Sequence, residues 1–325
     1  MIIPFLRGFL CIALHYVDKY FSFSCIVFTL VMQGKFDRLH SFWHTYEEKL
    51  SEMSINYING VVSHYPKTSL AWKILLNDPF VKSQWEMADY LVVGKMGYNA
   101  HGDTHALVVA ANALRILSIL IRREVLPDIA KDGLGDIDDG FLIVLVSSLL
   151  HDIGNQVNRR DHNLHGGYLA LPIIDKLLER IYDDPFKRGV VRAFILHSIF
   201  THMEDERSYT VEASVVKLAD GTDMSKGRSR LPYSLGNVNI HSVSAMSVDG
   251  VEIVEGEDFP IEIRVFMTNS SGVFQVEEIL QRKLSAGVLE DKVKIVAKTI
   301  PEDVDKDERL VYRLIGKFGR FIHER

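Results

Sequence analysis

Histidine and aspartate residues at the ends of apolar runs are the residues of this sequence best suited to binding a metal ion. The pair His151-Asp152 closes the apolar run Leu142–Leu150, and Asp220 closes a second apolar run over residues 215–219. An unpaired carboxylate at the edge of a core is strongly disfavoured, and a divalent cation is one of the few groups that compensate it. The alternative for His151-Asp152 is an aspartate that caps the following turn beside a hydrogen-bonded histidine.

Seven of the thirteen histidines lie between residues 101 and 202. Two of these seven lie at the start of a predicted helix. His105 opens the predicted helix Ala106–Leu120, and His101 lies one turn earlier. Histidines four residues apart can share a metal ion if the turn between them is helical. Gly102 argues against a helix at this point, so His101 is predicted to lie near the substrate or to cap the helix.

Two short basic segments, one before His162 and one after Asp220, have donors for a phosphate group. Guanidinium groups bind phosphate oxygens through paired hydrogen bonds. The segment after Asp220, taken alone, is at least as well interpreted as a solvated loop. The residues concerned are Arg159, Arg160, Lys226, Arg228 and Arg230.

The order of these segments resembles the His…His-Asp…Asp signature of the HD superfamily of metal-dependent phosphohydrolases. The matching segments are Asn-Ala-His-Gly-Asp-Thr-His at 99–105, Leu-His-Asp-Ile-Gly at 150–154 and Leu-Ala-Asp-Gly-Thr-Asp at 218–223. The chain is similar in particular to prokaryotic, largely archaeal, HD proteins in which a small α+β domain follows the helical one. The resemblance covers roughly residues 35–300 and does not include residues 1–33.

The resemblance implies a helical bundle in which four residues bind one divalent cation. These ligands are His105, His151, Asp152 and Asp220. Histidine nitrogen with carboxylate oxygen suits Mn²⁺, Ni²⁺, Co²⁺, Fe²⁺, Zn²⁺ or, with more oxygen ligands, Mg²⁺.

Members of the superfamily with a second metal ion add histidines between the His-Asp pair and the last aspartate. His162 precedes a helix of small residues and best matches the first added ligand, with His165 one turn away as a competitor. His197 matches the next position, but Ser198 stands where some two-metal members have a further histidine. One or two ions per chain are therefore expected.

The expected reaction is hydrolysis of a phosphomonoester or phosphodiester, in a nucleotide-like substrate, by water activated at the metal. A bound cation lowers the pKa of its water and polarises a phosphoryl oxygen. Asp152 and His151 are the predicted catalytic residues, and His101, His165 and the basic segments are predicted to bind substrate. The alternative is a catalytically silent HD domain that acts as a nucleotide-binding regulatory or assembly module.

The net charge argues against a nucleic-acid-binding protein, and the cysteine content argues against a disulfide-rich one. The 325 residues carry 37 basic and 43 acidic side chains, a net charge of −6. No nucleic-acid-binding patch is evident from this balance, because affinity for a phosphate backbone comes from clustered Lys and Arg. Both cysteines, Cys11 and Cys25, lie in the first 25 residues, which argues against a disulfide framework and favours a cytoplasmic protein.

The first 33 residues are apolar and aromatic and differ from the rest of the chain. Their uninterrupted run, Tyr20–Gln33, has 14 residues, whereas a membrane-spanning helix needs about 20. Three interpretations stay open: a membrane-associated anchor, an extra core helix, or an upstream stretch outside the working protein. The third is favoured because ordinary composition begins near Met32.

Apolar spacing predicts a mainly α protein whose ligands lie on helices. Helical periodicity covers about residues 34–223, and the helical domain is predicted over 34–233 because the pattern changes after Pro232. A small α+β domain of order β-β-β-α-β is predicted over 234–300. Its strands are expected at 240–248, 251–254, 261–267 and 292–298, with a hairpin turn at Asp249-Gly250 and a helix over 273–286. A final helix is predicted over 301–325, and the open edge of the small sheet favours a homodimer or other homo-oligomer.

Overall fold

The computed structural model describes residues 47–224, 244–300, 313–317 and 320–324, and side chains up to residue 300. Residues Lys49–Arg325 form one compact unit. The predictions for residues 1–33 and for Lys226, Arg228 and Arg230 lie outside the described residues.

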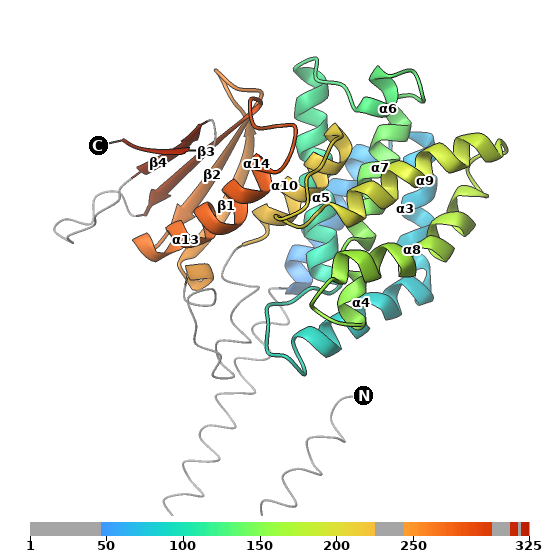
Figure 1. Cartoon of the computed structure of the whole chain (residues 1–325), viewed down its shortest axis with the longest axis horizontal. Helices are drawn as coiled ribbons and strands as arrows, with labels where there is room; N and C mark the ends of the chain where they lie inside the picture. The colour runs from blue at the N-terminus through green and yellow to red at the C-terminus, as the bar shows by residue number, and fades with distance from the viewer. Residues whose placement is uncertain (1–46, 225–243, 301–312, 318–319, 325) are drawn as a thin grey trace, which may run out of the picture. The chain divides into compact units, whose positions relative to one another are not determined.

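The described part of the chain up to residue 224 is helical, which confirms the mainly α prediction (Figure 1). A helix over residues 47–62 comes first. It is followed by α3 (Pro66–Asn77), α4 (Pro79–Val92), α5 (Asp103–Arg122), α6 (Asp128–Lys131), α7 (Ile137–Leu150), the 3-10 turn η1 (Ile153–Gln156), α8 (His162–Leu178), α9 (Pro185–Phe200) and α10 (Val211–Thr222).

Helix α7 is the centre of the helical part. Every residue from Asp139 to Leu150 is buried, and the helix contacts α3, α5, α9 and α10. A helix that is apolar on all sides is stable only when other helices surround it. Its start is fixed by a capping box in which Asp136 and Asp139 each accept a hydrogen bond from the other's backbone N–H. The end of α7 therefore carries His151 and Asp152 into the interior of the bundle.

Helix α5 packs against α7 and α10 and brings His105 to the same region. Among the described residues, α5 alone is long and apolar enough to cross a membrane, but 67% of its most apolar window is buried in the protein. Burial of this kind is typical of a core helix in a globular protein.

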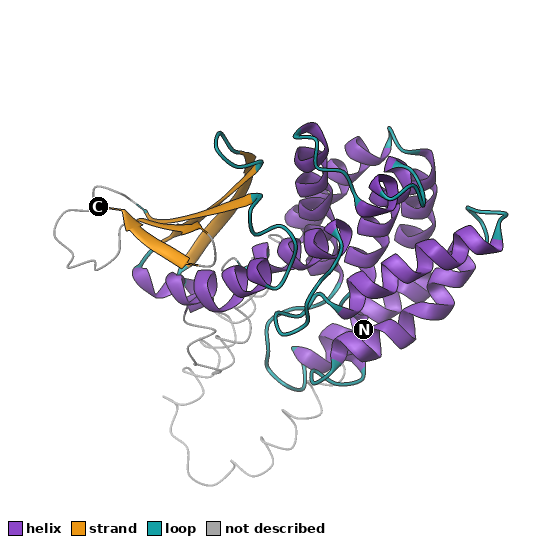
Figure 2. Ribbon diagram, turned by 45° about the horizontal axis from the view of Figure 1, so that its top comes forward, coloured by secondary structure: helices purple, strands orange, loops and turns teal. Residues whose placement is uncertain are grey.

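The C-terminal part is a small sheet with one helical connection (Figure 2). The strands β1 (Val248–Glu255), β2 (Ile261–Met267), β3 (Val293–Thr299), β4 (Arg313–Lys317) and β5 (Arg320–Glu324) lie in the order β1-β2-β3-β4-β5. Only the β2–β3 pair is parallel. A parallel pair needs a crossover, and this crossover consists of η2 (Ser270–Gly272), α13 (Val273–Gln275), the π-helical η3 (Val276–Gln281) and α14 (Arg282–Ser285).

The predicted hairpin turn at Asp249-Gly250 is wrong. Strand β1 runs through both residues, and the pairing with β2 shifts register between Val248 and Gly250, which marks a β-bulge. A bulge and a tight turn both favour glycine, so the dipeptide alone does not distinguish them. The predicted strand 240–248 is wrong at residues 244–246, which are helical, and only its last residue, Val248, lies in β1.

The predicted final helix over 301–325 is wrong for its described residues. Strands β4 and β5 form an antiparallel hairpin there, and β4 pairs with β3 from Ile295 to Lys298. Strand propensity depends on the available partner, and the exposed edge of β3 provides one that local sequence does not reveal. The small sheet therefore continues beyond residue 300 and gains two strands.

The helical and C-terminal parts share a hydrophobic core, and α10 contacts α14 directly. This contact places residues of the crossover beside the end of α10, where Asp220 lies. The C-terminal part therefore borders the candidate site.

Candidate metal centre

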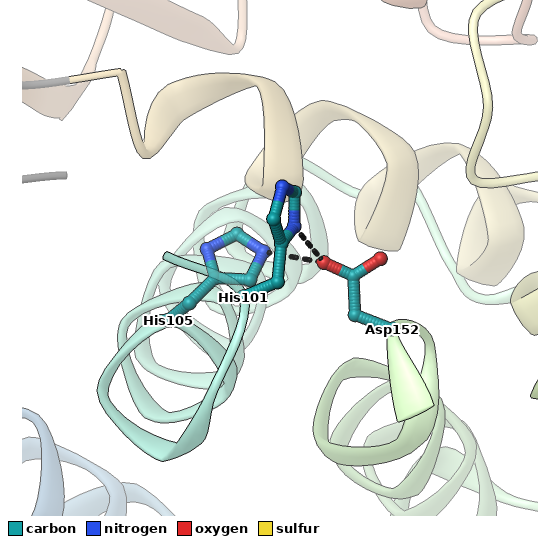
Figure 3. Close-up of side chains that lie close together, drawn as sticks. All are labelled: His101, His105 and Asp152. Carbon is teal, nitrogen blue, oxygen red and sulfur yellow. Dashed lines mark hydrogen bonds and ion pairs between the residues drawn. The ribbon is translucent and has the colours of Figure 1, made fainter. Parts of the chain in front are cut away.

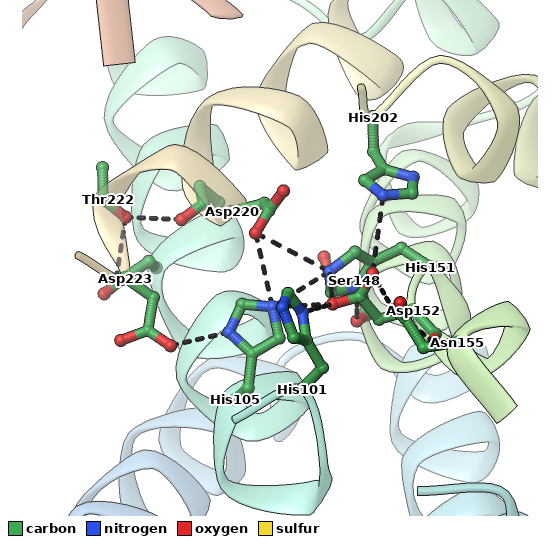
Figure 4. A network of polar contacts seen from close by, with 12 residues as sticks. His101, His105, Ser148, His151, Asp152, Asn155, His202, Asp220, Thr222 and Asp223 are labelled. Carbon is green, nitrogen blue, oxygen red and sulfur yellow. Dashed lines mark hydrogen bonds and ion pairs between the residues drawn. The ribbon is translucent and has the colours of Figure 1, made fainter. Parts of the chain in front are cut away.

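Segments far apart in the sequence converge on a buried group of histidines and aspartates, most of which Figure 4 shows. Helix α5 contributes its first turn, α7 its C-terminal end, α8 its first residue and α10 its last turn, and the segment after α9 contributes a histidine. The residues brought together are His101, His105, His151, Asp152, His162, His202 and Asp220. Each has at most about a tenth of its side chain exposed.

The first ligand group consists of His105, His151, Asp152 and Asp220. The Nε2 atoms of His105 and His151 are 3.2 Å apart. Oδ2 of Asp152 lies 3.3 Å from Nε2 of His105 and 3.4 Å from Nε2 of His151. Oδ1 of Asp220 lies 3.3 Å and 3.8 Å from the same two nitrogens. The four residues named from the sequence as ligands of one cation therefore face a common point.

The second ligand group consists of His162, His202 and the other oxygen of Asp152. Oδ1 of Asp152 lies 3.2 Å from Nε2 of His162 and 3.6 Å from Nε2 of His202. The two Nε2 atoms are 3.1 Å apart. Asp152 thus directs one oxygen to each group and lies between them.

These separations fit ligands of a shared cation. Two ligand atoms that each lie about 2.1 Å from one ion, at angles near 90–110°, are about 3.0–3.4 Å apart. Most of the distances within the two groups fall in or just above this range. The buried His and Asp residues could therefore hold a metal ion.

The outward nitrogen of each ligand histidine is anchored by an acceptor. Nδ1 of His151, His162 and His202 donates to the carbonyl oxygens of Ser148, Arg159 and Ile199, at 2.8, 2.9 and 2.7 Å. Because a carbonyl oxygen only accepts, the proton must lie on Nδ1. Nδ1 of His105 is 2.6 Å from Oδ2 of Asp223. Neutral imidazoles with Nδ1 protonated present a lone pair on Nε2, which is the form that binds a metal.

Burial and the charges of neighbouring side chains shift the pKa values of residues in the site. Burial raises the pKa of Asp152, but the charges of His151 and His101 and hydrogen bonds from His101 and His105 hold it well below its usual value. Burial alone would lower the pKa of His151, yet the charges and hydrogen bonds of Asp152 and Asp220 raise it. Burial lowers the pKa of His202 to about 4, so this histidine is neutral at pH 7 and able to act as a ligand.

His101 belongs to the centre through Asp152 (Figure 3). Its Nδ1 lies 2.5 Å from Oδ2 of Asp152, and its backbone N–H donates to Oδ1 of Asp89 at 2.6 Å. Helix α5 begins at Asp103, so His101 precedes the helix and does not share a helical turn with His105. His101, His105 and Asp152 are also one of the groups of described residues that could hold a metal ion, so His101 is placed both as a possible ligand and beside the predicted substrate site.

Gly154 explains how the His-Asp end of α7 approaches α8 so closely. A Cβ at this residue would collide with the backbone of His162 and of Gly166. The absence of a side chain lets η1 lie directly against the first turn of α8. This close approach brings His162 within reach of Asp152.

His197 was predicted as a metal ligand, but the structure places it outside both ligand groups. His202 lies in the second ligand group instead. Nε2 of His197 accepts from the backbone N–H of Tyr209 at 3.1 Å, and the two rings stack with centroids 6.1 Å apart. Helix α9 ends at Phe200, and the chain turns so that His202 points into the centre. His202 was the remaining histidine of the 101–202 cluster without a predicted role.

The other predicted substrate residues lie at different distances from the centre. Nη1 of Arg159 is 3.3 Å from Nε2 of His162 and 3.1 Å from Oδ1 of Asn155, so Arg159 borders the second ligand group. Arg160 is exposed and pairs with Asp161. His165 is half-buried on α8 and is not among the groups of described residues whose atoms could share an ion.

Lys283 is a residue of the centre that the sequence did not indicate. It lies on α14, and its Nζ is 2.7 Å from Oδ2 of Asp220. Burial raises the pKa of Asp220, but the charge of Lys283 and hydrogen bonds from His105 and His151 hold it well below its usual value. No local signal marks Lys283, since it comes 63 residues after Asp220.

Comparison with known proteins identifies one family relationship. Over 248 residues the chain is 41% identical to the uncharacterized protein MJ1020 of Methanocaldococcus jannaschii, a match that covers 76% of this chain and 93% of that protein. No family model matches the chain, and no solved structure matches it.

Proposed function

This chain belongs to the same family as protein MJ1020, and we propose that it is a metal-dependent phosphohydrolase of the HD type. The proposal extends to a centre for two divalent cations. The first would be held by His105, His151, Asp152 and Asp220, and the second by His162, His202 and Asp152.

The position of Asp152 carries this proposal. Each of its carboxylate oxygens lies 3.2–3.3 Å from the nearest Nε2 of a different pair of histidines. A carboxylate in this arrangement can bridge two cations, and paired cations about 3.5–4 Å apart recur in phosphatases and nucleases. A single-ion site would leave the His162–His202 pair without a ligand role.

When bound, the cations would supply Lewis-acid catalysis, since a cation polarises a phosphoryl oxygen and lowers the pKa of bound water. The side chains of the protein would orient the ligand atoms and balance the charge of the cations. The acceptors of the four Nδ1–H groups fix the imidazole rings, so Nε2 is directed inward without a cost in side-chain entropy at binding. His101, 2.5 Å from Oδ2 of Asp152, can hold or move a proton at this carboxylate.

Arg159 supports the choice of a phosphorylated substrate. Its guanidinium borders the second ligand group and is half-buried, so it can donate to a phosphate oxygen at the edge of the centre. His165 is half-buried and Arg160 exposed on the same segment, and we propose that they bind the remainder of a nucleotide-like substrate.

Metal analysis combined with a substrate panel tests the proposed function. The purified protein should contain up to two equivalents of divalent metal per chain. With Mn²⁺, Ni²⁺ or Co²⁺ added, it should hydrolyse at least one member of a panel of aryl phosphomonoesters, aryl phosphodiesters and mono-, di- and cyclic nucleotides. Nucleotide binding without product across the panel would favour a silent regulatory module instead.

Two variants connect the site with the activity. His151→Ala should lose one equivalent of metal and Asp152→Ala both, and each variant should lose hydrolysis. Wild-type metal content and turnover in both variants would refute the assignment of the site.

A further inference from the structure

Lys283 comes from the crossover of the C-terminal sheet, yet its ammonium group lies within the metal centre. Nζ donates to Oδ2 of Asp220 at 2.7 Å and to the carbonyl oxygen of His202 at 2.7 Å. The side chain is 5% exposed. One ammonium thus contacts a residue of each ligand group.

Gly221 leaves the space through which Lys283 reaches the site. A Cβ on Gly221 would lie 3.0 Å from Cδ of Lys283 and 3.2 Å from Cδ1 of Leu280. These distances are shorter than ordinary van der Waals contacts, so a side chain here would push against α14. The glycine that follows Asp220 therefore permits the close packing of α10 against η3 and α14.

The two oxygens of Asp220 have different surroundings. Oδ1 faces Nε2 of His105 and of His151, at 3.3 and 3.8 Å, whereas Oδ2 faces Lys283. Carboxylate ligands bind cations through one oxygen or through both. An oxygen that already accepts from an ammonium is a poor second ligand, because the ammonium and the metal ion repel each other.

We propose that Lys283 is a positioning residue that restricts Asp220 to a single donor oxygen toward the first cation. This inference rests on the proposed function. Catalytic metal sites keep a coordination position for water or substrate. A second oxygen from Asp220 would occupy such a position, and Lys283 prevents this by holding Oδ2 away.

Replacement of Lys283 by methionine tests the proposal, with Co²⁺ as the probe. Lys283→Met keeps most of the length of the side chain and removes the ammonium. The full-length variant should bind Co²⁺ in wild-type amounts, but its visible absorption should weaken, because d–d bands lose intensity as the coordination number rises. Hydrolysis of a panel substrate should fall about tenfold, the size typical for loss of a group that orients a ligand.

Two further variants separate positioning from a general structural role. Lys283→Arg keeps a cationic donor and should restore most of the Co²⁺ absorption. Lys217→Met removes another buried ammonium that donates to the carbonyl of Ala286, at the end of α14. This variant should be less stable to heat but should keep the wild-type Co²⁺ spectrum.

The possible outcomes distinguish this inference from the proposed function. An unchanged Co²⁺ spectrum in Lys283→Met, loss of Co²⁺ from that variant, or the same spectral change in Lys217→Met would each overturn the role of Lys283. Failure of the wild-type protein to bind Co²⁺ would overturn the metal centre itself and the inference with it. Normal Co²⁺ binding without hydrolysis would count against the phosphohydrolase alone, since the spectral comparison would still decide the role of Lys283.

Discussion

Asp223 lies beside His105, with its Oδ2 2.6 Å from Nδ1 of the imidazole. In the other three histidines of the two ligand groups, Nδ1–H donates to a backbone carbonyl oxygen. His105 is therefore the ligand whose orientation depends on a side chain that can be replaced (Figure 4). A carboxylate behind a histidine also makes Nε2 a stronger donor to a metal ion.

Replacement of Asp223 should weaken the first cation site. We expect Asp223→Ala to lower metal affinity about 10- to 100-fold, because the imidazole of His105 loses its anchor. Asp223→Asn should lie between this variant and the wild type, since the amide oxygen still accepts but carries no charge. Competition with a chromophoric chelator measures the affinities. Asp103→Ala is the control, because Asp103 is exposed and lies on α5, the helix that carries His105.

The bridging position of Asp152 predicts different metal contents for three variants. Asp152→Ala should bind neither ion tightly, because both groups lose a ligand. Asp220→Ala and His162→Ala should each keep one equivalent at moderate metal concentration, since each removes a ligand from one group only. Elemental analysis after gel filtration gives the ratio of metal to protein. One full equivalent retained by Asp152→Ala would show that Asp152 does not link the two groups.

The two histidines at the end of α9 should behave in opposite ways. His202→Ala should lose the second equivalent of metal and most hydrolysis, about 100-fold or more if both ions take part in the reaction. His197→Ala removes the contact with Tyr209 and should leave metal content within about twofold of the wild type. The same assays apply to both variants. A loss of metal in His197→Ala alone would restore the assignment made from the sequence.

Asp139 should make stability depend on pH in the acid range. Burial raises the pKa of its carboxyl, but hydrogen bonds from Lys187, Lys67 and Tyr182 lower it to about 2 from an ordinary 3.8. A group with a folded pKa below its unfolded pKa stabilises the fold at pH values above the unfolded pKa and loses this effect as pH falls toward the folded one. The expected contribution is about 2 kcal/mol, present above pH 4 and lost toward pH 2.

Urea unfolding of wild type and Asp139→Asn between pH 6 and pH 2.5 measures this effect. The difference in free energy of unfolding between the two proteins should shrink as pH falls. Asp175→Asn, which removes an exposed ion pair with Arg192, should show little change over the same range. A difference that stays constant with pH would contradict the assigned ionisation of Asp139.

Several features could be predicted from the sequence because they depend on local pattern. The helical part follows from apolar spacing, and His105, His151-Asp152 and Asp220 stand out because each lies at the end of an apolar run. A charged or polar ligand at such a point needs a partner wherever the helix packs. This requirement holds before the neighbouring helices are known, but only the resemblance of these segments to the HD signature joined the four residues into one predicted ligand set.

The tertiary structure decided the remaining features. Whether His197 or His202 enters the centre depends on how the chain leaves α9, and this turn is set by packing against the segment at Tyr209. The hairpin of β4 and β5 forms because β3 has a free edge, and Lys283 reaches Asp220 only because α14 packs against α10 beside Gly221. Contacts between elements far apart in the chain leave no periodic signal, since periodicity reports which face is buried and not what buries it.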